Sequence, residues 1–140
     1  MQRPDCGCLF GRGNRGAVQR AGSVQILYGT TDGIASDGGQ VLFGGVSGSG
    51  EAFAQASAEF GASVAVGDFN GDGYDDLAVG MPYADVDLDL YYAPGAVMVM
   101  YGAFGGLDPA VFEVFHQDTP GMEGDGNQTH DKFGAALVSG

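Results

Sequence analysis

A short acidic segment, DFNGDGYDD at residues 68–76, holds the side chains of this chain that are best suited to chemistry. Its oxygen-bearing side chains recur at alternate positions, at Asp68, Asn70 and Asp72, and Asp76 follows four residues later. Calcium is a hard cation that takes about six to eight oxygen ligands. A loop that curls around the ion can turn several of these oxygens inward. The spacing therefore predicts a calcium loop.

The residue types in this segment also define a ligand set. Gly71 and Gly73 allow the sharp curl that such a loop needs. Asp75 is expected to face solvent. With water completing the shell, the expected calcium ligands are the side chains of Asp68, Asn70 and Asp72, the backbone carbonyl of Tyr74 and the closing carboxylate of Asp76.

The same segment is also compatible with a loop that binds no calcium. A solvated turn of Asp, Asn and Gly residues in a hairpin would have a similar composition. An EF-hand would need a glutamate at its twelfth loop position and flanking helices, whereas position 12 counted from Asp68 is Val79, in an apolar stretch. Magnesium demands stricter geometry than a flexible loop enforces, so calcium is the expected ion.

The elements that carry this loop are predicted to be β-strands. The chain has 140 residues, enough for one small domain or part of one. Apolar residues come in short stretches rich in β-branched and aromatic types, bounded by Gly, Asp or Pro. The 27 glycines indicate many tight turns. Because no stretch shows helical spacing or the length of a transmembrane helix, we expect an all-β protein without membrane insertion.

The net charge of the chain limits the classes of partner that it can bind. The net charge is −13, and the first 20 residues hold four arginines against one aspartate, which leaves −16 for residues 21–140. Such an acidic surface repels the phosphates of nucleic acids and anionic lipid headgroups. Crowded carboxylates are costly to fold together unless cations neutralise them. The charge therefore favours cation binding and argues against nucleic acid as a partner.

The sequence repeats itself at an interval of 73 residues. AGSVQILYGTTDGI at 21–34 returns as PGAVMVMYGAFGGL at 94–107, and EFGASVAVG at 59–67 returns as KFGAALVSG at 132–140. A unit of several short strands cannot bury both faces of its own small sheet, so it must stack on further copies. Radial stacking gives a β-propeller, and a solenoid of stacked sheets is the alternative.

One complete repeat is expected to form the four strands of a propeller blade. These strands are predicted at about 62–67, 76–80, 95–101 and 110–116. The chain would then hold strands 3 and 4 of one blade, a complete second blade and strand 1 of a third. Small residues dominate the first two strands, so these strands are expected to lie where blades crowd together near the axis.

The segment FGASVAVGDFNGDGYDDLAVGMP at 60–82 resembles an FG-GAP repeat of the kind found in the N-terminal β-propeller of integrin α-subunits. Phe60-Gly61 matches the FG element and the tripeptide at 80–82 matches GAP, with Met81 in place of the usual alanine. The resemblance implies a fragment of a calcium-binding propeller, about one and a half four-stranded blades, from a secreted or cell-surface protein.

The resemblance also sets the expected domain organisation. Residues 21–140 form part of the propeller, with the complete repeat at about 60–132. Residues 1–20 match nothing in the repeat and are expected to be disordered or foreign to it. The next copy of the first calcium aspartate would fall one residue after Gly140, so we expect the chain to be a fragment of a longer protein.

Several functions are compatible with these features. The resemblance implies a non-catalytic, calcium-binding module for cell adhesion or protein binding, located outside the cell or on its surface. Its partner would be a protein ligand or the neighbouring blades of a longer chain. One alternative is an accessory propeller of a larger secreted enzyme, such as a phospholipase or another hydrolase. A third is a gene fragment without a function of its own, since uncovered apolar sheet faces would remain.

No recognisable catalytic or cofactor-binding set accompanies the loop. The string GRGNRG at 11–16 fits a dinucleotide-binding pattern but lacks the preceding strand and the following helix. His116 and His130 have no nucleophile or carboxylate in a triad context. The run from Asp85 to Asp89 could bind a second cation or a partner, but it is expected to be a solvated hairpin tip.

Overall fold

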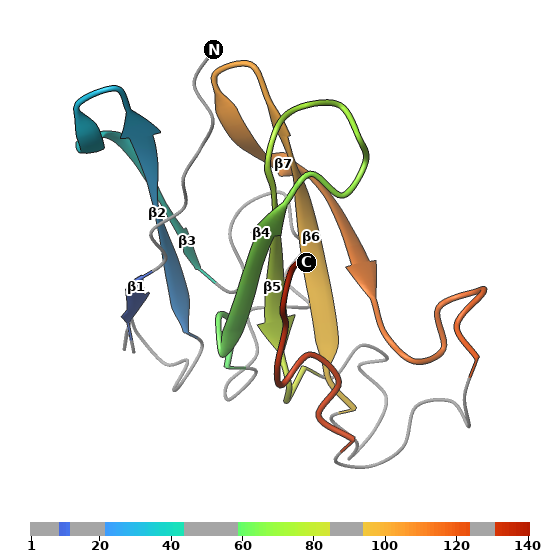
Figure 1. Cartoon of the computed structure of the whole chain (residues 1–140). Helices are drawn as coiled ribbons and strands as arrows, with labels where there is room; N and C mark the ends of the chain where they lie inside the picture. The colour runs from blue at the N-terminus through green and yellow to red at the C-terminus, as the bar shows by residue number, and fades with distance from the viewer. Residues whose placement is uncertain (1–8, 12–21, 44–58, 85–93, 124–130) are drawn as a thin grey trace.

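The computed structural model describes residues 9–11, 22–43, 59–84, 94–123 and 131–140. Within these residues the chain forms two antiparallel β-sheets and no helix (Figure 1). The first sheet has the order β1 (Leu9–Gly11), β2 (Ser23–Thr30), β3 (Gly33–Phe43). The second has the order β4 (Ser63–Gly67), β5 (Asp76–Met81), β6 (Ala96–Ala103), β7 (Gly106–Phe115). The predicted all-β fold is confirmed.

The second sheet is the four-stranded blade that the repeat predicts. Its strands lie within two residues of the predicted ranges, except that β7 begins at residue 106 instead of 110. A turn of only two residues, Phe104 and Gly105, joins β6 to β7, so that Leu107 already pairs with Gly102. Gly105 has a φ of 95°, a conformation that glycine adopts at no steric cost. The early start of β7 follows from this tight turn.

The main hydrophobic core lies between the two sheets. The first sheet contributes Val24, Ile26 and Leu42. The second sheet contributes residues from β5, β6 and β7, namely Leu77, Val79, Met81, Met98, Met100 and Leu107. Full burial of one such side chain stabilises the fold by about 1.5–3 kcal/mol. This core is therefore what joins the two sheets into one unit.

A smaller core covers the opposite face of the second sheet. It consists of Ala65, Ala78, Val97 and Val99, against which Phe133 and Leu137 pack, among other partly buried side chains. Residues 131–140 run in front of this face (Figure 1). Because both of its faces are covered, β5 is buried along its whole length.

The repeat in the sequence is also a repeat in the structure. Among the described residues, Glu59 and Lys132 are the non-glycine residues with positive φ, at 54° and 55°, and each precedes a Phe-Gly dipeptide. The N–H of Ala62 donates to the carbonyl of Glu59 at 2.9 Å, and the N–H of Ala135 donates to that of Lys132 at 2.9 Å. The same turn therefore forms twice.

Two glycines let each copy of this turn lie against the preceding sheet. A Cβ atom on Gly22 would overlap the backbone of Phe60, and a Cβ on Gly95 would overlap the backbone of Phe133. Both glycines also have positive φ, at 79° and 92°. Only glycine meets both requirements, which is the reason that it stands at this position in both copies.

A hydrogen-bonded clamp joins the two sheets at one end, and we call it the Tyr28 clamp. The hydroxyl of Tyr28 donates to Oε1 of Gln40 at 2.6 Å and accepts from the N–H of Leu107 at 2.9 Å. Nε2 of Gln40 donates to the carbonyl of Leu107 at 3.0 Å. Two side chains of the first sheet thus satisfy both backbone groups of one residue in the second sheet.

The two ends of the chain differ from the complete blade. The repeat predicts the first strand of a third blade at the end of the chain, but residues 137–140 form no strand. In the complete blade the corresponding strand, β4, pairs with β5, and no described strand pairs with residues 137–140. Within residues 1–20, Leu9–Gly11 form β1 and pair with β2, while the other residues of that segment lie outside the described ones.

Substitution of Gly22 by alanine is expected to lower the free energy of unfolding more than the same change at Gly38. The two glycines have nearly equal φ, 79° and 77°, so the left-handed conformation costs alanine about 1–2 kcal/mol at either site. Only at Gly22 does the added Cβ also meet backbone, whereas at Gly38 nothing lies within 4 Å. Overpacking should add about 1–3 kcal/mol there.

Urea unfolding of the two variants beside the unchanged chain measures this difference. Equal losses at the two positions would contradict the close approach between Gly22 and Phe60.

Candidate metal-binding loop

The acidic segment forms the loop that links β4 to β5, residues 68–75. Gly67 and Asp76 pair with each other, so the loop closes a hairpin between two neighbouring strands. Gly71 and Gly73 have φ of 75° and 88°, and no atom lies within 4 Å of where their Cβ would be. The two glycines therefore make the curl in open solvent.

The carboxylate of Asp68, the first predicted ligand, accepts hydrogen bonds from the backbone of the loop. Its Oδ1 accepts from the N–H groups of Gly71 at 2.7 Å and Asp72 at 3.1 Å. Its Oδ2 accepts from the N–H of Gly73 at 2.8 Å. One exposed carboxylate thus binds three successive backbone donors, which fixes the path of the loop around it.

Asn70 and Asp72 are bound into the same network. Oδ1 of Asn70 accepts from the N–H of Asp72 at 3.2 Å, the donor that Asp68 also uses. Nδ2 of Asn70 donates to Oδ2 of Asp72 at 3.1 Å, and Oδ1 of Asp72 accepts from the N–H of Tyr74 at 2.9 Å. The structure therefore links the three alternate side chains within a single hydrogen-bonded turn.

Asp76, the predicted closing ligand, is buried, with 1% of its surface exposed. Its Oδ2 accepts from the N–H of Phe69 at 2.7 Å, and its Oδ1 accepts from the N–H of Gly102 at 2.8 Å. A buried carboxylate is tolerated only when it is hydrogen-bonded in this way. Asp76 thereby ties the start of the loop to β6.

The bond to Gly102 was not predicted from the sequence. Gly102 corresponds to Gly29 at the 73-residue interval, so its recurrence is a signal that the sequence does carry. The structure supplies the reason, since a Cβ on Gly102 would overlap the carbonyl of Asp75. Strand β6 therefore passes directly against the end of the loop.

The surroundings of Tyr101, next to Gly102, raise the pKa of its hydroxyl. Burial raises the pKa of Tyr101, and the hydrogen bond from its hydroxyl to Oε2 of Glu113, at 3.0 Å, raises it further. The charges of Glu113 and Asp76 act in the same direction. The Tyr101 hydroxyl therefore stays protonated and available as a donor at neutral pH.

The oxygens of the loop keep free lone pairs with which they could bind a cation. A carboxylate or amide oxygen can accept about two hydrogen bonds. Oδ1 of Asn70, both carboxylate oxygens of Asp72 and both of Asp76 each accept one hydrogen bond from the described residues. Oδ2 of Asp68 also accepts one. The donor set therefore fits a hard cation by its chemistry.

The carboxylates do not form a compact cluster. In the part of the chain that the structure describes, no three His, Cys, Asp or Glu side chains are grouped closely enough to hold one metal ion. Asp68 and Asp72 are exposed on the loop, whereas Asp76 lies beneath it. Asp75, which was expected to face solvent, is half-buried.

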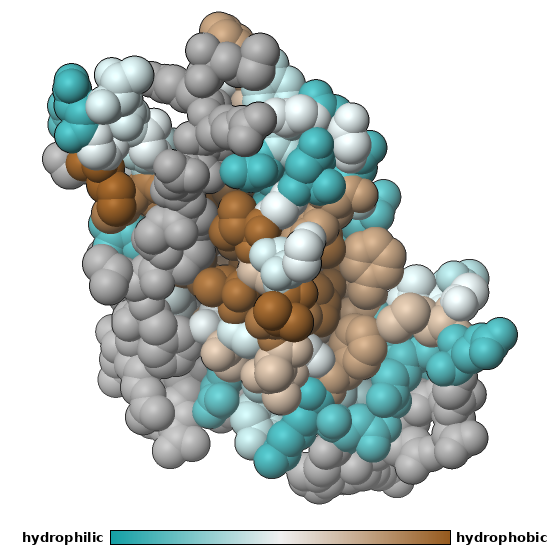
Figure 2. All heavy atoms as spheres, in the orientation of Figure 1, coloured by the Kyte–Doolittle hydropathy of each residue, from teal (hydrophilic) through white to brown (hydrophobic). Residues whose placement is uncertain are grey.

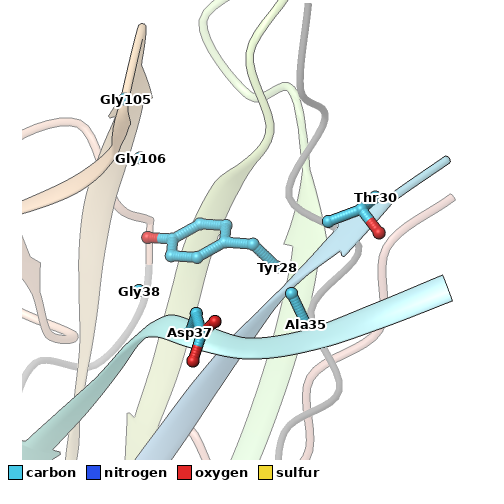
Figure 3. A pocket seen from close by; sticks show the side chains of 7 residues that line it. All are labelled: Tyr28, Thr30, Ala35, Asp37, Gly38, Gly105 and Gly106. Atoms are coloured by element: carbon cyan, nitrogen blue, oxygen red, sulfur yellow. The ribbon is translucent and has the colours of Figure 1, made fainter. Parts of the chain in front are cut away.

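A pocket of about 300 Å³, not expected from the sequence, lies between the two sheets. It is lined by Tyr28, Thr30, Ala35, Asp37, Gly38, Gly105 and Gly106. Figure 3 shows the Tyr28 ring in its middle with Asp37 beside it. The Tyr28 hydroxyl is already engaged in the Tyr28 clamp. The run from Asp85 to Asp89 and His130 lie outside the described residues.

Substitution of Asp76 by asparagine is expected to destabilise the fold by about 1–3 kcal/mol in metal-free buffer. The asparagine amide has only one oxygen, so it can accept from the N–H of Phe69 or from that of Gly102, and the other N–H loses its partner. Asp75→Asn, at the neighbouring and less buried position, is the control and should cost less. Chemical unfolding with a chelator present compares the two. A smaller loss at Asp76 than at Asp75 would contradict the bridging role of this carboxylate.

Comparison with known proteins finds a family match for the segment that contains the acidic loop. Residues 60–100 match the family model of the FG-GAP repeat. The matched segment begins at the Phe60-Gly61 turn and includes β4, the acidic loop, β5 and most of β6. Comparison with curated protein sequences gives no match. The chain therefore contains an FG-GAP repeat, which forms most of the four-stranded blade of a β-propeller fragment.

Proposed function

We propose that this chain is a calcium-binding FG-GAP module without a catalytic role, which acts in cell adhesion or protein binding. The observation that carries the proposal is the arrangement of the acidic loop. Asp68 and Asn70 both accept from the N–H of Asp72, and Asp72 accepts from the N–H of Tyr74, so the three side chains belong to one hydrogen-bonded turn that forms without an ion. A turn that is already formed requires little further ordering when a cation binds.

Asp68, Asn70, Asp72, the carbonyl of Tyr74 and Asp76 would hold the calcium ion. Short acidic side chains on a flexible loop suit calcium, which accepts varied oxygen geometry at about 2.3–2.6 Å. The net charge of −13 makes the neutralisation of loop carboxylates favourable. The ion supplies positive charge at the loop, and the chain supplies the turn that positions the oxygens.

The role of the ion would be structural. Asp76 already joins the loop to β6 through Phe69 and Gly102. An ion held by Asp68 and Asp72 on the loop and by Asp76 beneath it would fasten the loop to the blade. A stiffened blade end is what a protein-binding surface requires, because ordering on binding then costs less.

A location outside the cell or on its surface is part of the proposal, and it rests on the family resemblance. Extracellular calcium modules bind the ion with dissociation constants of about 10⁻⁴–10⁻³ M, a range that an exposed loop with few rigid ligands can reach. Among the described residues there is no helix with the length and apolar character needed to cross a membrane. The partner would be a protein ligand or further blades.

Titration of calcium into the chain by calorimetry is expected to give one saturable binding event. Asp72→Asn should raise the dissociation constant about tenfold or more, because it removes a ligand charge while leaving the shape of the side chain unchanged. Asp75→Asn removes the same charge from the neighbouring sequence and should leave the affinity nearly unchanged. Equal losses in the two variants would point to general electrostatic attraction instead of a site.

Thermal melting separates binding to the folded loop from binding to the unfolded chain. At a calcium concentration of about 100 times the dissociation constant, a site present only in the folded state stabilises it by about 2.7 kcal/mol. A chelator should reverse the shift in melting temperature. A folded chain that shows neither heat nor a shift would leave the loop as a solvated acidic turn.

A further inference from the structure

The surface by which the first sheet contacts the second is repeated on the outside of the second sheet. Val24, Ile26 and Leu42 of the first sheet pack into the main core. At the 73-residue interval these positions become Val97, Val99 and Phe115, which belong to the smaller core on the outer face of the second sheet. The outer face therefore carries the same kind of contact surface, one blade further on.

The Tyr28 clamp is repeated there as well. Tyr101 and Glu113 correspond to Tyr28 and Gln40 at the same interval. The Tyr101 hydroxyl donates to Oε2 of Glu113 at 3.0 Å, as the Tyr28 hydroxyl donates to Gln40 at 2.6 Å. In the clamp between the sheets, this side-chain pair holds the backbone N–H and carbonyl of Leu107. The outer pair is thus formed, and its Tyr101 hydroxyl could accept from the equivalent backbone N–H of another sheet.

The chain also exposes the complementary surface, on the outer face of its first sheet. Leu107 and Val114 of the second sheet pack at the main core, and their counterparts Ile34 and Val41 are 63% and 48% exposed. Figure 2 shows hydrophobic side chains at the surface both over the second sheet and over the hairpin of β2 and β3. Each molecule therefore presents both halves of an interface that it also contains internally.

We propose that two copies of this chain associate head to tail, with the outer face of the first sheet of one copy covering the outer face of the second sheet of the other. Ile34 of the incoming copy takes the place that Leu107 has in the Tyr28 clamp. Its backbone N–H donates to the hydroxyl of Tyr101. Because the two faces differ, the interface is heterologous, and each copy keeps one face free for a further copy.

Residues 137–140 support the same arrangement. In the part of the chain that the structure describes, the first sheet has three strands and lacks a counterpart of β4. Residues 137–140 correspond to β4 residues at the 73-residue interval but form no strand. Phe133 and Leu137 already pack on the outer face of the second sheet, as their counterparts Phe60 and Val64 pack at the main core. An incoming sheet edge would give this segment a partner for its backbone groups.

The glutamate in the outer pair sets the strength of the contact. Gln40 donates from its amide to the carbonyl of Leu107, but the carboxylate of Glu113 carries no N–H group with which to donate. The outer clamp therefore offers two of the three hydrogen bonds of the inner one. Glu113→Gln restores the missing donor and removes a negative charge from the interface.

The test is the oligomeric state of the chain, measured by sedimentation velocity over a range of concentrations. The unchanged chain is expected to form dimers and larger species as its concentration rises. Ile34→Asp should keep it monomeric, since it places a charge against an apolar face. Phe104→Asp is the matched control, because Phe104 is 87% exposed at a hairpin tip outside both faces, and it should leave association unchanged.

A second variant tests the proposal with a change that should strengthen association. Glu113→Gln should lower the dissociation constant about fivefold, the effect expected for one added hydrogen bond. Glu123→Gln makes the same chemical change at an exposed position outside both faces and should have no effect. Both variants are made at exposed positions, so loss of folding does not obscure the result.

A folded chain that stays monomeric at all concentrations overturns the proposal, as does equal weakening by Ile34→Asp and Phe104→Asp. Equal strengthening by Glu113→Gln and Glu123→Gln would also overturn it, because charge alone would then account for the change. Each measurement is made with calcium and with a chelator. Association in both buffers upholds the proposal whatever the loop binds, so its outcome is independent of the calcium titration.

Discussion

The constraint on which this structure depends is that a small sheet with two apolar faces must be covered on both. Strand β5 is buried along its whole length, so it tolerates water on neither side. The first sheet covers one face through the main core, and residues 131–140 cover part of the other. A single blade cannot be stable alone under this constraint. The repeated sequence supplies a neighbouring sheet that covers its apolar face.

Backbone contacts, more than side-chain contacts, set the spacing between neighbouring units. Gly22 and Gly95 admit the backbones of Phe60 and Phe133 at positions where any side chain would overlap them. Gly102 does the same for the end of the acidic loop. The Tyr28 clamp then satisfies the backbone of Leu107 with side chains of the other sheet. The acidic loop is therefore positioned by strands whose separation is fixed at glycine positions.

The sequence predicted most of the fold because its signals were local or repeated. Short apolar stretches and the 73-residue interval were sufficient to locate β4, β5 and β6 within two residues. The start of β7 was missed because a two-residue turn leaves little trace in composition. Asp68, Asn70 and Asp72 lie on one hydrogen-bonded turn because their spacing is short, and their role as calcium ligands stays a prediction. The links from Asp76 to Gly102 and from Tyr28 to Leu107 join residues far apart in the chain, and no local pattern encodes them.

The long span of the Tyr28 clamp has a consequence for how the chain folds. The hydrogen bond from Leu107 to Tyr28 joins residues 79 apart, whereas that from Phe69 to Asp76 joins residues 7 apart. Closing a long segment costs more chain entropy than closing a short one, and contacts between distant residues slow folding. The acidic hairpin can therefore form early and serve as a nucleus, while the two sheets dock late. The apolar faces of the sheets stay exposed to solvent until docking, and the partly folded chain is most prone to aggregation during that time.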